Sequence, residues 1–245
     1  MNNVYFSEEH KLFRESLRDF LQKEVVPHIE KWEKTGEIER FIWKKMGDMG
    51  YFGLAYPEEY GGLDLDIFYT LIFLEELQRI NSGGFAAAMW AHAYLAMTHL
   101  KAEGDAAIKE KYLAPSISGD KIGCLCITEP FGGSDVAGMR RTAVRQGDHY
   151  ILNGSKTFIT NGQHANILLL ACKTDRDKGA QGVSLILVET DGLQGFSRGR
   201  NLKKTGLAGQ DTSELFFDNV RVPQKNILGG MEGLGFMHMM QELPQ

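Results

Sequence analysis

The hydrophobic periodicity of the chain changes once, near Lys121, and this change limits the possible folds more than any other feature. Before Lys121, apolar residues recur every three or four positions, which is the spacing of helices that bury one face. After it, β-branched and aromatic residues alternate with polar ones and are interrupted by dipeptides typical of hairpin turns, Gly147-Asp148, Asn153-Gly154 and Asn161-Gly162. The sequence therefore predicts an α-helical bundle followed by a small antiparallel β-barrel or sandwich.

The first region is expected to hold five helices. Ser7 followed by Glu8 and Glu9 is a helix start, and the apolar repeat continues to Val25, just before Pro27. Two of the later helices are apolar on almost all sides, which indicates burial within the bundle. The predicted helices cover residues 7–25, 41–49, 67–80, 85–100 and 105–113.

The second region is expected to hold short strands over residues 122–128, 167–172, 183–189 and 214–217. Near Gly230 the pattern becomes helical again, but the sequence ends at Gln245, before a helix of useful length is complete. We therefore expect an α+β multidomain chain. Its predicted parts are an N-terminal all-α domain (1–118), a middle β-barrel domain (119–229) and the start of a truncated helical domain (230–245).

Composition excludes several classes of function. The 245 residues are 43% hydrophobic with a formal charge of −5, and no basic stripe predicts binding to nucleic acid. No apolar span reaches membrane length and no signal or transit peptide is recognisable, so we expect no membrane insertion and a cytoplasmic location. The scattered histidines lack metal-ligand spacing, and Cys124, Cys126 and Cys172 are expected to be buried thiols in a reducing compartment.

Two short segments carry most of the functional information. In 125–135 (LCITEPFGGSD), a strand gives way to Pro130 and a glycine-rich turn, where missing side chains let a ligand approach the backbone. Exposed N–H groups in such a turn, with the Ser134 hydroxyl, suit a polar or anionic group. In 156–162 (KTFITNG), Phe158 offers a flat apolar face, and Thr160 presents a hydroxyl on the same side of the strand. This combination suits a flat ring with polar edges, such as a flavin.

Each segment alone is also compatible with an ordinary turn or an ordinary strand. Together and in this order they resemble a pattern of the acyl-CoA dehydrogenase family, TEPxxGSD followed by GxKxFITNG. Three further stretches resemble the same family in order: 57–62 (PEEYGG), 204–211 (KTGLAGQD) and 215–229 (LFFDNVRVPQKNILG).

The resemblance, which is strongest to the long-chain-like branch, implies a specific domain order and activity. The family has two helical domains around a β-barrel, and the second helical bundle is missing from these residues, so we expect a fragment of a longer enzyme. In this family a carboxylate removes the α-proton of an acyl-CoA thioester while the β-hydrogen leaves as hydride to N5 of FAD. An electron-transfer flavoprotein is the implied electron acceptor, and a homotetramer is the implied assembly of the complete enzyme.

The resemblance also implies which residues form the site. The backbone of residues 125–128 would line the flavin, and Phe158, where many relatives have Trp, would cover the ring face. The implied cofactor-binding residues are Leu125, Cys126, Ile127, Thr128, Gly133, Ser134, Phe158, Ile159 and Thr160. The implied substrate-binding residues are Ser134, Phe236, Met237, Pro244 and Gln245.

No catalytic residue is assigned within the sequence. In the long-chain-like branch the base is the second Glu of an E-L-P-Q-E-R motif, whereas this sequence ends with ELPQ, so the base is expected just after Gln245. Glu129 and Asp135 are placed in the cofactor turn, and Glu242 caps or solvates a helix. We therefore expect this fragment to bind flavin weakly and to be inactive.

Two other interpretations remain open. A flavin oxidase or flavin monooxygenase shares the same architecture but uses oxygen or another substrate, and a fragment that only binds flavin or another ligand would be non-catalytic. The acyl-chain length also stays open, because Met89, Trp90 and Tyr94 suit either an acyl pocket or a helical core.

Overall fold

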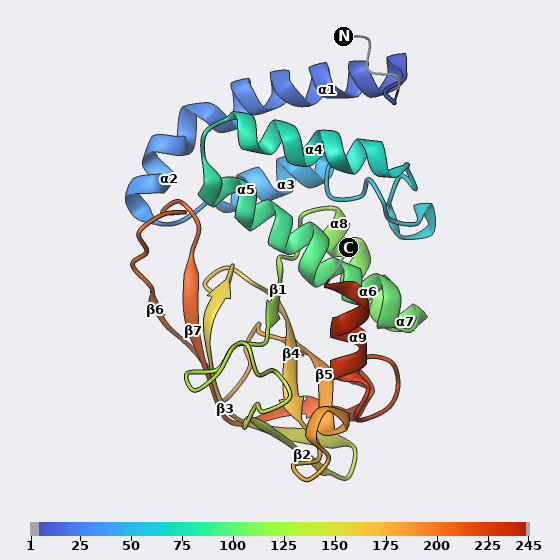
Figure 1. The fold of residues 1–245 in the computed structure, drawn as a ribbon, viewed down its shortest axis with the longest axis vertical. Coiled ribbons are helices and arrows are strands. Elements are labelled where there is room, and N and C mark those ends of the chain that lie inside the picture. Colours follow the sequence, from blue (N-terminus) through green and yellow to red (C-terminus); the bar gives the residue numbers. More distant parts are fainter. Residues whose placement is uncertain (1–4, 244–245) are drawn as a thin grey trace. The chain divides into compact units, whose positions relative to one another are not determined.

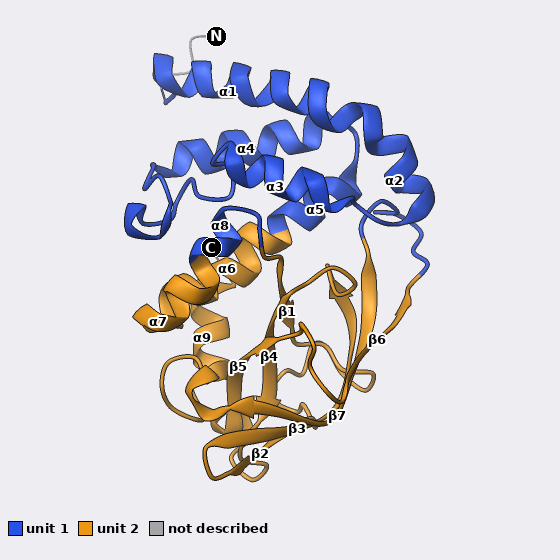
Figure 2. Cartoon of the chain, turned by 180° about the vertical axis from the view of Figure 1, so that it is seen from behind, with its two compact units in different colours: residues 1–90, 114–120, 203–210 blue, residues 91–113, 121–202, 211–245 orange. Residues whose placement is uncertain are grey.

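The computed structural model describes residues 5–243 (Figure 1). The chain divides into two compact units, each assembled from several segments (Figure 2). Unit 1 comprises residues 1–90, 114–120 and 203–210, and unit 2 comprises residues 91–113, 121–202 and 211–245. The domain boundaries expected at 118/119 and 229/230 stay predictions.

Unit 1 is helical. Its α-helices are α1 (Glu8–Phe20), α2 (Ile29–Thr35), α3 (Arg40–Asp48), α4 (Ile67–Arg79), α5 (Gly83–Trp90) and α8 (Ala114–Ile117). α1 begins as predicted, because the Ser7 hydroxyl accepts a hydrogen bond from the His10 N–H. Beyond Phe20 the chain continues through a π-helical turn (Leu21–Val25) and a 3₁₀ turn (Val26–His28), where Pro27 is tolerated.

Apolar faces and one buried carboxylate hold unit 1 together. The rings of Trp32 and Phe85 stack with centroids 5.6 Å apart. The buried Glu76 on α4 accepts hydrogen bonds from Arg14 (3.0 Å) and Arg18 (2.9 Å) on α1. Burial alone would raise the pKa of Glu76, but these guanidinium groups outweigh it and hold that pKa below its usual value.

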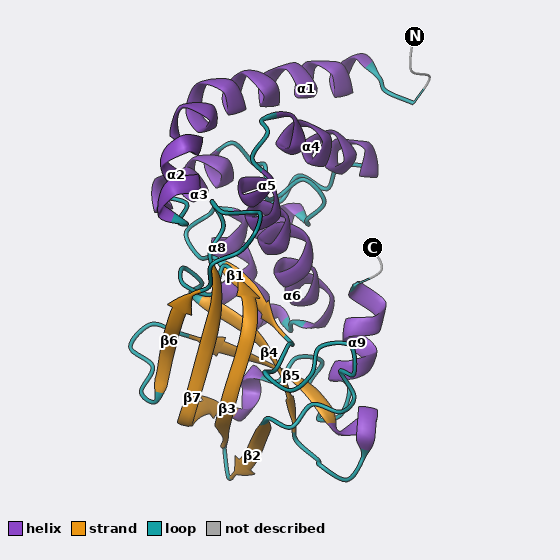
Figure 3. Ribbon diagram, turned by 60° about the vertical axis from the view of Figure 1, so that its left-hand side comes forward, coloured by secondary structure: helices purple, strands orange, loops and turns teal. Residues whose placement is uncertain are grey.

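Unit 2 contains a curled sheet and three short α-helices, α6 (Met97–Glu103), α7 (Ala106–Ile108) and α9 (Gly235–Glu242) (Figure 3). The π-helical turn η4 (Ala91–Ala96) precedes α6, and the π-helical turn η5 (Lys109–Leu113) follows α7. α9 packs against α6 and β5. The strands are β1 (Gly123–Cys126), β2 (Thr142–Gln146), β3 (His149–Thr160), β4 (Ile167–Lys173), β5 (Val183–Glu189), β6 (Phe196–Asn201) and β7 (Thr212–Pro223).

The succession of a helical region and a β region is confirmed, but the sheet is mixed, so the prediction of an antiparallel barrel is wrong. The strand order is β1-β4-β2-β3-β7-β6, with β5 also paired to β4. β1 and β2 run parallel to β4, whereas the other pairs are antiparallel. Hairpin dipeptides predict only the antiparallel pairing of consecutive strands. They give no information on the pairing of β1 with β4, because β2 and β3 lie between these two strands in the sequence.

The predicted turns differ in outcome. Gly147-Asp148 connects β2 to β3, and Gly147 adopts the left-handed φ (62°) that such hairpin loops need. Asn153-Gly154 is not a turn but lies within β3, where the pairing with β7 shifts register between Leu152 and Gly154. The glycine there marks a bulge, which is the alternative meaning of an isolated glycine in a strand.

The sheet encloses an apolar core, and all seven residues of β4 are buried. The three thiols are buried, as predicted, and burial raises the pKa of Cys172 to about 12. Among the described helices, none has the length and apolar character needed to cross a membrane.

Leu168 on β4 tests this assignment of the core. Because its side chain is fully buried, we expect Leu168→Ala to lower the free energy of unfolding by about 2–5 kcal/mol in urea denaturation. Val144→Ala on β2 is the control, since Val144 is 53% exposed, and it should cost less than about 1 kcal/mol. Equal losses in the two variants would contradict the assignment.

Candidate functional site

The structure places the two predicted motif segments side by side within unit 2. The Thr157 N–H donates a hydrogen bond to the Thr128 C=O at 3.0 Å. Lys156 Nζ donates to the Ile127 C=O at 2.8 Å. These bonds join the end of β1 to the second half of β3, so the glycine-rich turn and the Phe-Ile-Thr strand belong to one local structure.

A buried ion pair lies at this junction, and sequence reasoning missed it. Lys156 Nζ is 2.9 Å from Glu129 Oε1, and the two residues are only 1% and 4% exposed. The Glu129 carboxylate also accepts the N–H groups of Arg140 (2.8 Å) and Arg141 (3.1 Å). Burial alone would raise the pKa of Glu129, but the Lys156 charge and these N–H donors outweigh it and hold that pKa below its usual value. The ionised carboxylate thus holds both ends of the loop between residues 129 and 141.

The glycine-rich turn is closed by its own backbone and is open to solvent. The Glu129 N–H donates to the Gly132 C=O (3.0 Å), and the Gly132 N–H donates back to the Glu129 C=O (3.1 Å). Residues 131–135 are exposed, and a Cβ added at Gly132 would meet no atom within 4 Å. The Asp135 carboxylate accepts the Gly138 N–H at 2.9 Å and so fixes the next turn. Gly133 and Ser134 are therefore accessible to a ligand.

β1 presents one edge that no described strand pairs. Its partner is β4, and the register begins with Gly123 opposite Ile167. The N–H and C=O of successive strand residues point to alternate edges, and the Ile122 C=O accepts the Ile167 N–H at 3.1 Å. Leu125 and Ile127 therefore direct their backbone groups to the edge away from β4.

Side chains of β1 alternate in the complementary way. Cys124 and Cys126 are buried in the sheet core, with their Sγ atoms 3.6 Å apart. Leu125, Ile127 and the following Thr128 are only half-buried. The Cys126 thiol thus lies in the sheet core and its backbone groups point toward β4, so Cys126 supports the outer edge of β1 without directing a polar group to it.

Phe158 has the most unusual backbone of the predicted site residues. Its φ of 57° is left-handed, a conformation that is rare for a bulky side chain and that concentrates at ligand sites. It lies where the β3–β7 register shifts between Lys156 and Ile159, which is a β-bulge. The ring is 66% exposed, whereas Ile159 is 2% exposed. The bulge therefore turns the Phe158 ring outward.

The end of the second motif is held by the start of β7. Thr160 is half-buried and lies opposite Thr212 in the register. Beyond it, the Asn161 N–H donates to the Asp211 C=O (3.2 Å), and the Gln163 N–H donates to the Asp211 carboxylate (2.7 Å). The strand that carries Phe158 and Thr160 is therefore fixed on both sides of the bulge.

The predicted substrate residues lie elsewhere or are not described. Phe236 is half-buried and Met237 is 47% exposed, both on α9. Pro244 and Gln245 lie outside the described residues. The substrate role of these residues stays a prediction. Within residues 5–243, no group of three or more His, Cys, Asp or Glu side chains is arranged to hold a metal ion.

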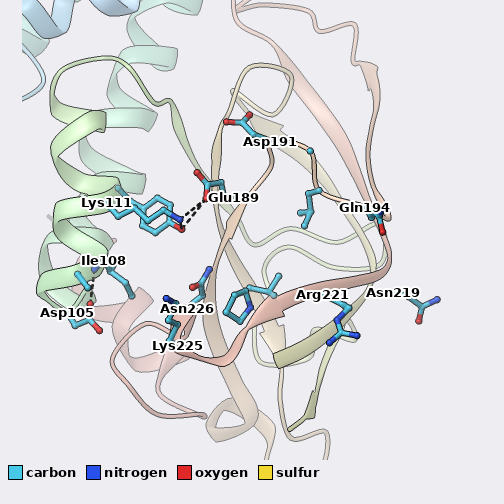
Figure 4. Close-up of a pocket in the computed structure, with 16 residues that line it drawn as sticks. Asp105, Ile108, Lys111, Glu189, Asp191, Gln194, Asn219, Arg221, Lys225 and Asn226 are labelled. Atoms are coloured by element: carbon cyan, nitrogen blue, oxygen red, sulfur yellow. Dashed lines mark hydrogen bonds and ion pairs between the residues drawn. The ribbon is translucent and has the colours of Figure 1, made fainter. Parts of the chain in front are cut away.

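A cavity of about 540 Å³ in unit 2 is separate from the predicted site, because none of the predicted site residues lines it (Figure 4). Several of its charged groups are already engaged. Lys111 Nζ lies 3.0 Å from the Glu189 carboxylate, and Asp105 accepts the Ile108 N–H at 2.8 Å. The lining holds three acidic residues (Asp105, Glu189, Asp191) and three basic residues (Lys111, Arg221, Lys225), so its charges balance and we assign the cavity no chemistry.

Glu129→Gln tests the buried ion pair. Without the carboxylate, Lys156 is left as an unpaired buried charge, so we expect a loss of about 3 kcal/mol or more in the free energy of unfolding. Adding Lys156→Met should recover part of the loss. The surface pair Asp175–Lys178 is the control, and Asp175→Asn should leave stability unchanged.

The pH dependence gives a second measurement on the same variant. A carboxyl group whose pKa is lower in the folded state than in the unfolded state stabilises the fold when it is ionised. This contribution is fully present above the unfolded-state pKa of about 4.3, and it is lost as the pH falls through the lower folded-state pKa. The difference in stability between wild type and Glu129→Gln should therefore narrow below about pH 4.3. A difference independent of pH would argue against an ionised Glu129.

Comparison with known proteins places this geometry in a family. Residues 7–120 match the N-terminal domain of acyl-CoA dehydrogenases, and residues 124–220 match their middle domain. The long-chain specific acyl-CoA dehydrogenase of Mus musculus is 43% identical over 242 residues, which are 98% of this chain. This chain spans 55% of the length of that relative.

Solved structures of acyl-CoA dehydrogenases share the fold of this chain. An acyl-CoA dehydrogenase from Geobacillus kaustophilus superposes with a TM-score of 0.94 at 43% identity, covering 99% of this chain and 63% of that one. An acyl-CoA dehydrogenase from Bacillus anthracis complexed with FAD has a TM-score of 0.90 at 32% identity and covers 99% of this chain and 41% of that one. With both domain matches in chain order and the two motif segments joined in one site, this chain belongs to the acyl-CoA dehydrogenase family.

Proposed function

We propose that the joined motif segments bind FAD and that the whole protein oxidises an acyl-CoA thioester to its α,β-unsaturated product. The observation that carries the proposal is the junction itself, in which Lys156 contacts both Ile127 and Glu129. It brings the open turn, the unpaired edge of β1 and the outward Phe158 ring into one local structure. Family membership and the FAD complex of the Bacillus anthracis protein support the choice of cofactor.

The residues fit an isoalloxazine on three counts. Its imide edge has an N–H between two carbonyl groups, and the outer edge of β1 offers a complementary acceptor at the Leu125 C=O and donor at the Ile127 N–H. The exposed Phe158 ring supplies an apolar plane for the ring face. The hydroxyls of Thr128 and Thr160 supply further polar contacts. Cys126 and Ile159 support the site from the buried side of their strands.

The turn suits the polar part of the cofactor. Gly133 and Ser134 are exposed, and Gly133 lies near the end of β1, since a Cβ there would contact Thr128 Cγ2 at 3.4 Å. We assign Ser134 to both the cofactor and the acyl-CoA. Phe236, Met237, Pro244 and Gln245 are assigned to the substrate alone.

When bound, the flavin accepts the hydride from the β-carbon of the thioester. The protein residues named here bind and orient the ring. Alignment of two reactants in this way can lower the activation barrier by roughly 7–11 kcal/mol. We assign no base within the sequence and place it beyond Gln245. An electron-transfer flavoprotein as electron acceptor, a homotetrameric assembly and a cytoplasmic location complete the proposal.

Phe158→Ala tests the ring contact. We expect the 245-residue chain to bind FAD, measured as the change in the visible absorption bands of oxidised flavin during titration, and the variant to bind at least about tenfold more weakly. Phe216→Ala is the matched control, because Phe216 is an exposed phenylalanine (42%) on β7 of the same sheet. A colourless wild-type chain that cannot be reconstituted with FAD would refute the proposed cofactor.

Anaerobic addition of octanoyl- or palmitoyl-CoA tests where the base lies. We expect the flavin of the reconstituted 245-residue chain to stay oxidised, because the site lacks the group that removes the α-proton. Sodium dithionite should reduce the same sample and serves as the positive control. Rapid bleaching by acyl-CoA would place the base within this sequence.

A further inference from the structure

The first N–H of β1 is bonded from outside the sheet. The Gly123 N–H donates to Nδ1 of His92 at 3.0 Å, and both residues belong to unit 2. His92 lies in the π-helical turn η4 and is completely buried (0% exposed). A ring nitrogen that accepts a hydrogen bond carries no proton, so Nδ1 is the unprotonated nitrogen of this imidazole.

The contact between β1 and η4 is close because residue 123 is glycine. A Cβ there would lie 3.0 Å from the Ala96 Cβ and 3.7 Å from His92 Nδ1. No side chain can be inserted without moving the turn. π-Helical turns are rare and occur often at functional sites, where the extra residue redirects the side chains of a helix. Here the turn brings an acceptor to the edge of β1 that faces away from β4.

This edge is the one to which we assign the flavin, and it is fixed at both ends. At its start, His92 binds the Gly123 N–H. At its end, Lys156 binds the Ile127 C=O at 2.8 Å. The backbone groups of Leu125 and the Ile127 N–H lie between these two anchors on the same edge.

We propose that His92 is a positioning residue for the cofactor, acting through the Gly123 N–H to hold the flavin-facing edge of β1. The proposal rests on the proposed function, since the ligand of that edge is FAD. Its consequence is specific: removal of the acceptor at Nδ1 should weaken FAD binding more than it disturbs the fold. A side-chain amide oxygen in the position of Nδ1, as in His92→Asn, should restore FAD binding.

His99 on α6 provides a matched control. It is equally buried (0% exposed), but neither of its ring nitrogens has a hydrogen-bond partner among the described residues. Burial and the neighbouring His238 lower the pKa of His99 to about 4, so the ring is neutral at pH 7. Replacing His99 therefore removes the same buried volume without removing an anchor of β1.

The experiment measures the FAD dissociation constant of the 245-residue chain by titration of flavin fluorescence, with circular dichroism as a check of folding. His92→Leu should weaken binding by about tenfold or more, as expected for a buried N–H that loses its partner. His92→Asn should bind within about threefold of wild type, because Asn Oδ1 lies where Nδ1 was. His99→Leu should bind like wild type.

Amide hydrogen exchange gives a readout that does not depend on flavin. The Gly123 amide should exchange faster in His92→Leu than in wild type, and its protection should return in His92→Asn. If His92→Leu does not fold, His92→Gln takes its place, since its longer side chain displaces the acceptor and should weaken FAD binding relative to His92→Asn.

Unchanged FAD binding in His92→Leu, or equal weakening in His92→Leu and His99→Leu, would overturn the proposal while leaving the proposed function intact. Failure of wild type and all variants to bind FAD would instead overturn the proposed function, and this proposal with it.

Discussion

The ion pair between Lys156 and Glu129 is the interaction on which the site depends. Burying two charges is costly, and their attraction offsets this only when the remaining donors and acceptors are also satisfied. Here Lys156 Nζ also binds the Ile127 C=O, and the Glu129 carboxylate also accepts two backbone N–H groups. The pair can form in one arrangement of β1, β3 and the loop after β1. Its contribution is therefore to specify a geometry more than to add stability.

That geometry explains why a strained residue is tolerated nearby. Phe158 keeps a left-handed backbone two residues after Lys156, between strand segments that are paired on both sides. A single strained residue of this kind costs on the order of 1–3 kcal/mol and persists only when its surroundings determine it. The buried ion pair on one side and the bonds to Asp211 on the other provide this support. The outward orientation of the Phe158 ring is thus set by the contacts on both sides of it, not by the intrinsic backbone preference of phenylalanine.

Sequence reasoning predicted the features that depend on neighbouring residues. The helix start at Ser7, the hairpin at Gly147 and the change from helical to strand periodicity are all present. The parallel pairing of β1 with β4 was missed, because pairing between distant strands leaves no mark in either strand. The Lys156–Glu129 pair joins residues 27 apart, and nothing in a strand pattern signals that a lysine will be buried. The two motifs could be recognised from their order, but not the contact that joins them.

The same contacts decide which carboxylates near the site are available for proton transfer. A base that removes a weakly acidic α-proton works best with a raised pKa and an oxygen free to approach the substrate. Glu129 meets neither condition, since its pKa is lowered and its oxygens are bound by Lys156 and two backbone N–H groups. Asp135 already accepts the Gly138 N–H. The two acidic residues of the first motif therefore shape the turn, and this role agrees with the proposed placement of the base outside this site.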